Sequence, residues 1–208
     1  MKNATRFKRS PLALAILALL AQEPMHPYRM RQLIKERGMG EVINVRQRAS
    51  VYQTIERLLR DGLIAVRETS REAGRPDRTV YEATETGNAV LREWLHTILA
   101  VPLQEFPEFP AGLSFLAMLE PDEVRRRLEE RKTALERELD RIDAMLRASQ
   151  DKVPRLFLLE IEYKRVVTNT EREWVCSVIE DLRSGSLYWD ETWLREIGER
   201  LNNRGSRP

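Results

Sequence analysis

The stretch "NVRQRASVYQTIERLLRDGLI", residues 44–64, decides the fold, because it has helical spacing and two different faces. At 100° per residue, an apolar arc lies opposite a polar arc of arginine, serine and glutamine. Asp61 and Gly62 predict the end of this helix. An ordinary solvated helix would mix more acidic side chains into its polar face. The apolar arc contains Val51, Ile55, Leu58 and Leu59, and the polar arc contains Arg46, Ser50, Gln53, Arg57 and Arg60.

Two further helices are predicted before this stretch. Residues 11–22, "PLALAILALLAQ", follow Ser10, a suitable N-cap, and start with a proline, which suits the first helical position. They are apolar nearly all round, so this helix should be buried at the centre of the domain. Residues 27–38 start with proline and end with Gly38, which predicts a second, shorter helix.

After residue 62 the pattern changes to a period of two. Residues 62–69 and 78–84 alternate apolar and polar side chains and are rich in Val, Ile, Thr and Tyr, which predicts two β-strands. The segment "SREAGRPD" between them is typical of a solvated hairpin tip. Thr84 or Thr86 then caps a helix that runs toward Pro102. Three helices followed by a hairpin form a winged helix-turn-helix, whose third helix enters the DNA major groove.

The second half of the chain is predicted to be an all-helical, coiled-coil-like domain. The segment "EFPEFP", residues 105–110, contains two prolines that interrupt a helix. We therefore predict a winged-helix domain at 1–100 and a helical domain at 111–202, a mainly α fold with a two-stranded β wing. The predicted C-terminal helices cover residues 111–119, 121–149, 154–185 and 191–203.

An apolar stripe follows the predicted helix 121–149 in steps of three, four and seven residues. One helix alone cannot bury such a stripe, so we expect a homodimer that covers it. The stripe consists of Val124, Leu128, Leu135, Leu139, Ile142 and Leu146.

Charge is divided unevenly between the two halves of the chain, although the whole chain carries only +2. Residues 1–100 contain 17 Lys and Arg against 11 Asp and Glu, a net charge of +6. Residues 101–208 have a net charge of −4. A basic half is where a polyanion binds, so double-stranded DNA is the expected partner of the N-terminal domain.

Other classes of protein find little support in the sequence. The single cysteine, Cys176, excludes an intrachain disulfide, fits a reducing compartment, and is expected to be a small buried hydrophobe. The N-terminal apolar run is too short to span a bilayer, and Leu19 lies where a signal peptide needs a small residue. We therefore expect a cytoplasmic protein without membrane contact. His26 and His96 lack the spacing of a zinc pair, and we expect no metal, no cofactor and no catalysis.

Four motifs, in order and spacing, resemble the PadR family of bacterial transcriptional regulators over residues 10–99. Members of that family show an apolar first helix, a His-Gly-Tyr turn, a recognition helix and a wing. Pro27 and Ala49 stand where family members carry glycine. The motifs in this chain are "HPY" (26–28), "ASVYQTI" (49–55), "LLRDGLI" (58–64) and "YEATETG" (81–87).

The resemblance implies a dimeric regulator that binds a pseudo-palindromic operator through half-sites about 10 bp apart. We interpret it as a repressor, although the sequence does not itself separate repression from activation. Some multidrug-binding relatives stack planar ligands on an aromatic residue of the helix that leads to the dimer region, which suggests release by a small aromatic effector. The alternative function is a winged-helix protein-interaction module that does not bind DNA.

The resemblance and the polar arc together give a set of expected site residues. Gln53 is expected to read a base, because glutamine can pair with adenine at two positions, and Arg57 is expected to meet a phosphate. Trp94, Phe115 and Trp174 are the candidate effector residues, with plain core packing as the alternative. The expected DNA-binding residues are Tyr28, Arg46, Gln47, Arg48, Ser50, Tyr52, Gln53, Arg57, Arg75 and Arg78.

Overall fold

The computed structural model describes residues 7–43, 48–70, 78–150 and 152–204. The chain divides into two compact units, Met1–Gln104 and Glu105–Pro208. In the described residues, no helix combines the length and the apolar character needed to cross a membrane.

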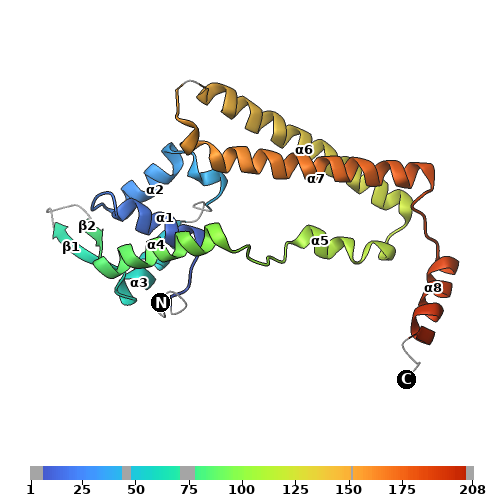
Figure 1. The fold of residues 1–208 in the computed structure, drawn as a ribbon, viewed down its shortest axis with the longest axis horizontal. Coiled ribbons are helices and arrows are strands. Elements are labelled where there is room, and N and C mark those ends of the chain that lie inside the picture. Colours follow the sequence, from blue (N-terminus) through green and yellow to red (C-terminus); the bar gives the residue numbers. More distant parts are fainter. Residues whose placement is uncertain (1–6, 44–47, 71–77, 151, 205–208) are drawn as a thin grey trace. The chain divides into compact units, whose positions relative to one another are not determined.

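The N-terminal unit has the element order of a winged helix (Figure 1). This confirms the predicted fold, in which three helices precede a two-stranded wing and a further helix follows. The elements are α1 (Pro11–Leu20), α2 (Pro27–Glu36), the 3₁₀ turn η2 (Met39–Glu41), α3 (Arg48–Arg60), β1 (Ile64–Ser70), β2 (Arg78–Ala83) and α4 (Glu85–Ala100).

Helix α1 lies at the centre of the core of this unit, capped as predicted by Ser10. The apolar arc of α3 packs in the same core, where Val51, Ile55 and Leu58 are each only 1% exposed. The prediction for Leu59 was wrong, because 38% of this side chain is exposed. Leu59 lies one helical step of 100° beyond Leu58, at the edge where the arc meets solvent.

Strands β1 and β2 form an antiparallel wing that is tied to the helices. The register pairs Ile64 with Ala83, and a bulge lies between Val66 and Glu68. Met25, in the turn between α1 and α2, exchanges two backbone hydrogen bonds with Tyr81 of β2, at 3.0 and 3.1 Å. The wing is therefore anchored to the turn that precedes α2.

The C-terminal unit is helical in all of its regular elements that the structure describes, as predicted. Some boundaries differ from the prediction. The helix predicted at 111–119 is instead a helix at Glu108–Leu113 followed by a 3₁₀ turn at Leu116–Met118. The first helix starts before Pro110, because the N–H that proline lacks has no intrahelical partner in a first turn. The segment after Pro154 is a 3₁₀ turn, so the next α-helix starts later. The elements are α5 (Glu108–Leu113), η3 (Leu116–Met118), α6 (Pro121–Ser149), η4 (Arg155–Phe157), α7 (Leu159–Ser184) and α8 (Glu191–Arg204).

Helices α6 and α7 run side by side in opposite directions (Figure 1). Val124, Leu128 and Ile142 of α6 are buried within a single chain, the first two in one cluster with Val175 and Ile179 of α7. For these three residues the inference that a second chain is needed to bury them was therefore wrong, because α7 folds back beside α6. The other three stripe residues, Leu135, Leu139 and Leu146, are half-buried.

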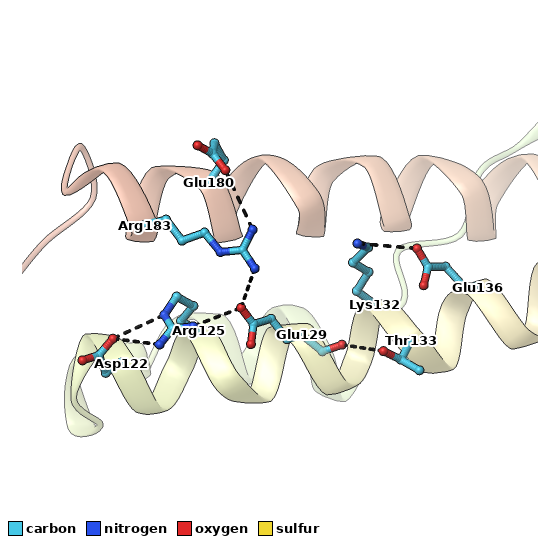
Figure 2. Close-up of polar contacts among 8 residues, drawn as sticks. All are labelled: Asp122, Arg125, Glu129, Lys132, Thr133, Glu136, Glu180 and Arg183. Carbon is cyan, nitrogen blue, oxygen red and sulfur yellow. Dashed lines mark hydrogen bonds and ion pairs between the residues drawn. The ribbon is translucent and has the colours of Figure 1, made fainter.

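Ion pairs connect α6 with α7 beside this apolar seam. Arg183 of α7 donates to Glu129 of α6 at 2.7 Å, and Arg125 donates to the same carboxylate at 3.0 Å (Figure 2). Farther along, Lys164 of α7 lies 2.6 Å from Glu138 of α6. Much of the charge of the C-terminal unit is thus neutralised internally.

Candidate nucleic-acid interface

The outward face of α3 carries the polar residues that the sequence placed there. Gln53 is exposed, and Ser50 and Tyr52 are half-buried. The Thr54 hydroxyl donates to the Ser50 carbonyl oxygen at 2.7 Å, so this hydroxyl is hydrogen-bonded within the helix. The exposed amide of Gln53 has both a donor and an acceptor available for a base edge.

Part of the expected DNA-binding set lies outside the described residues. This applies to Arg46, Gln47 and Arg75, and to the side chains of Arg48 and Arg78. The described members of the set lie on α2 and α3.

Arg57 lies in the last turn of α3 and is half-buried. Its Nη2 donates to the Ser10 hydroxyl at 3.4 Å, which brings the end of α3 beside the start of α1. Arg60, one turn farther, is exposed and makes no ion pair with a described residue. The end of α3 is therefore a basic edge of the same face.

Tyr28, at the start of α2, exposes 65% of its surface. The backbone N–H of Tyr28 donates to Nδ1 of His26, the N-cap of this helix, at 3.1 Å. Pro27 occupies the first helical position, where its fixed φ fits and no N–H is needed. The proline thus fits this turn without loss of a hydrogen bond.

A close corner between α3, β1 and α4 explains three positions of the motifs at 58–64 and 81–87. Gly62 ends α3 with φ of 70°, in the left-handed region that favours glycine. The Thr84 hydroxyl caps α4 by accepting from Gly87 N–H at 3.0 Å, and it donates to the Gly62 carbonyl oxygen at 2.8 Å. The sequence predicted the helix end at Gly62 and a cap at Thr84 or Thr86. It did not predict that the Thr84 hydroxyl also joins the end of α3 to the start of α4.

Tyr81 of β2 lies near Tyr52 and Glu56 of α3. Partial burial, the nearby Glu56 carboxylate and Tyr52 raise the pKa of the Tyr81 hydroxyl above its ordinary value. The ring packs against the N-terminal core. Its position makes it a support of α3.

The two units differ in how their cations are partnered. In the C-terminal unit most arginines of α6 and α7 pair with carboxylates, as Arg125, Arg131 and Arg165 do. In the described part of the N-terminal unit, ion pairs are found only for Arg29 and Arg67. The remaining described cations there carry charge that no described carboxylate neutralises. They are Lys8, Arg9, Arg31, Lys35, Arg37, Arg57, Arg60 and Arg92.

The three candidate effector residues lie in different surroundings. Trp94 is 2% exposed and belongs to the core of the N-terminal unit, whereas Phe115 is 68% exposed. Trp174 packs edge-to-face on Phe109 of α5, with ring centroids 6.0 Å apart. The Arg131 guanidinium lies 3.4 Å from the centre of the Phe109 ring.

Phe109 also lines a cavity of about 390 Å³ in the C-terminal unit. Its walls come from α5, η3 and the first turns of α6, and they are mainly apolar. Arg127 and Arg131 provide the cationic part of the lining, and Glu108 an acidic part. This is a volume in the range of small-ligand sites. No group of three or more His, Cys, Asp or Glu that could hold a metal occurs among the described residues.

Comparisons with known proteins confirm the resemblance. Residues 16–93 match the model of the transcriptional regulator PadR-like family. Among curated proteins, none matches the chain.

Several solved structures share the fold over most of the chain. The crystal structure of Bacillus subtilis PadR in complex with operator DNA has a TM-score of 0.65 and 20% identity, and it covers 83% of this chain and 99% of its own. The crystal structure of the same protein in complex with p-coumaric acid has a TM-score of 0.67 and 18% identity. This match covers 83% of this chain and 98% of that one. The structure of the Vibrio cholerae virulence activator AphA has a TM-score of 0.62 and 19% identity, and the match covers 83% of this chain and 98% of AphA.

Proposed function

Residues 16–93 are PadR-like, and from this premise we propose that the chain is a sequence-specific DNA-binding transcriptional regulator. It binds a pseudo-palindromic operator as a homodimer and acts as a repressor. Such a regulator works in the cytoplasm, where the DNA is, and it is a binding protein rather than an enzyme.

One observation carries the proposal most directly. The exposed face of α3 presents Gln53 together with the cations Arg57 and Arg60, and neither cation forms an ion pair with a described carboxylate. In winged helices this face of the third helix enters the major groove. Cations without an ion pair at the edge of a reading helix suit phosphates, because they need not break an internal ion pair to bind them.

Salt dependence of DNA binding tests this function. Operator fragments are selected from random DNA with the full chain, and their affinity is measured by fluorescence anisotropy at several salt concentrations. A protein that neutralises Z phosphates should give a log–log slope of about −0.9Z. A slope near zero, or failure to enrich any sequence, would leave the protein-interaction module as the better function.

The dimer needs a surface other than the seam between α6 and α7. Helix α7 exposes an apolar stripe along its outer side, with Tyr163 at 72% and Val166 at 60% exposure. A two-fold axis that places two copies of α7 against each other would bury this stripe in both. Contiguous exposed apolar surface of this kind is typical of interaction sites. The stripe consists of Leu159, Tyr163, Val166, Val167 and Trp174.

The cavity beside Phe109 is our candidate site for the small aromatic effector. Its apolar walls suit an aromatic ring. Arg127 and Arg131, which pair with Glu130 and Glu171, also line it, and a ligand carboxylate would share their guanidinium groups with these partners. Trp174 contributes indirectly, because it holds the Phe109 ring. Trp94 packs in the core of the N-terminal unit and is not part of this candidate site.

A further inference from the structure

The short segment before α1 carries two cations beside the end of the reading helix. Lys8 is exposed and Arg9 is half-exposed, and neither forms an ion pair with a described carboxylate. Together with Arg57 of α3 they form a group that we term the N-terminal basic cluster. Neither Lys8 nor Arg9 belongs to the set of DNA-binding residues expected from the sequence.

Two contacts fix this segment on the N-terminal unit. Phe7, directly before Lys8, packs against the hydrophobic core. Ser10, directly after Arg9, is the N-cap of α1, and its hydroxyl accepts from Ala13 N–H at 3.2 Å. The two cations are therefore held between two anchored residues, so little conformational entropy would be lost when they bind a ligand.

The hydrogen bond from Arg57 to Ser10 fixes where the cluster lies. The 3.4 Å contact joins residues that are 47 positions apart, and it places the segment against the last turn of α3. The acidic residues nearest to Arg57 in sequence are Glu56 and Asp61, and neither makes an ion pair with a described residue. The three cations of the cluster thus outnumber these two carboxylates.

We propose that the N-terminal basic cluster binds phosphate groups of the DNA backbone at the edge of the groove that α3 enters. This inference rests on the proposed function and extends the DNA interface to a segment outside the helix-turn-helix and the wing. Guanidinium and ammonium groups bind phosphate as charges and carry no base information. Lys8 and Arg9 therefore contribute affinity, not sequence preference.

The test compares three forms of the full chain on one selected operator and on unrelated duplexes. Lys8→Ala/Arg9→Ala should lower the steepness of the log–log salt dependence by about 2 and weaken binding about tenfold, equally on all sequences. The control, Arg126→Ala/Arg195→Ala, removes two exposed cations of the C-terminal unit that form no ion pair with a described residue. This variant should bind DNA as the wild type does. The control separates local contact from a change in net charge.

A second variant tests the anchoring. Phe7→Ala keeps every charge but releases the segment, so it should weaken binding while circular dichroism still reports a folded chain. If the wild type binds DNA and Lys8→Ala/Arg9→Ala shows the same salt dependence, the role of the N-terminal basic cluster is overturned, whereas the proposed function stands. A loss confined to one sequence also overturns this role, because it would mean base reading. A wild type without salt-dependent DNA binding overturns the proposed function itself.

Discussion

Gly87 at the start of α4 lies against the backbone of Leu63, so closely that a Cβ built on Gly87 would stand 1.9 Å from the Leu63 carbonyl oxygen. The backbone N–H of Thr84 donates to the same oxygen at 3.1 Å. The glycine of the motif at 81–87 is thus required by a close approach between α4 and the strand that follows α3. The consequence reaches the site, because this corner holds α3 relative to the wing.

Gly87→Ala should destabilise the N-terminal unit by about 1–3 kcal/mol, since backbone has to shift to accommodate the methyl group. The measurement is amide hydrogen exchange in α1, which reports opening of this unit. Gly40→Ala is the matched control, because a Cβ at Gly40 would meet nothing within 4 Å. Equal protection in the two variants would show that the corner relaxes without cost.

Gln53→Ala should relax sequence preference at one operator position, with a loss of discrimination of about 1–3 kcal/mol there. The exposed amide of Gln53 is the basis of this expectation. Affinities are measured for operators with each base at each position. Gln32→Ala on α2 removes an amide that bonds Glu36 at 2.6 Å, and it should leave the preference unchanged. Uniform weakening across all operators would mean that Gln53 does not read a base.

The elements of the N-terminal unit were largely predictable, because their signals are local. Ser10 before Pro11 and Thr84 before Glu85 are residue types that predict a helix start, and both act as N-caps in the structure. The two faces of α3 follow from the 3.6-residue period alone. The failure at Leu59 arose at an arc edge, where the neighbouring elements decide exposure.

Features that depend on tertiary neighbours were not predictable. The spacing of Val124, Leu128 and Ile142 indicates that a stripe is buried, but it does not indicate which helix covers it. Likewise, residue type marks Trp94 and Trp174 as aromatic, but only the fold places one in a core and the other on Phe109. The DNA contacts of the candidate site stay predictions.

Val166→Asp should convert the proposed dimer to a monomer while the helical unit stays folded, because this exposed side chain belongs to the outer stripe of α7. Sedimentation velocity gives the mass, and circular dichroism the helix content. Ile142→Asp is the contrast: Ile142 is 0% exposed within one chain, so its replacement should unfold the α6–α7 pair. A Val166→Asp chain that remains dimeric would move the interface off this stripe.

Gly112→Leu should block the cavity beside Phe109, since Gly112 lines it and a Cβ there would meet nothing within 4 Å. The probe is a small aromatic carboxylic acid, with binding measured by calorimetry on the full chain. Gly198→Leu adds the same side chain on α8, also in open space, and should leave binding unchanged. Equal binding by both variants would place the effector elsewhere, and no binding by the wild type would exclude this class of acid.

Glu138 should make the helical unit sensitive to acid. Two hydrogen bonds from Arg141, at 2.7 and 2.8 Å, and one contact from Lys164 hold its pKa at about 2, against an ordinary value of 4.5. A lowered folded-state pKa means that the charged pair stabilises the fold fully above pH 4.5, and that this contribution is lost as pH falls toward 2. Because the carboxylate is partly exposed, the contribution at pH 7 is about 1 kcal/mol or less.

Glu138→Gln removes this titration. The wild type should be the more stable form at pH 7, and the difference between the two forms should shrink below pH 4.5 and vanish below about pH 2. Urea denaturation of both forms across this range measures it. Asp140→Asn is the control, because Asp140 is exposed and has no described ion-pair partner. A difference between wild type and Glu138→Gln that stays constant with pH would mean that the substitution acts through packing, and that the Arg141 and Lys164 contacts do not stabilise the α6–α7 pair.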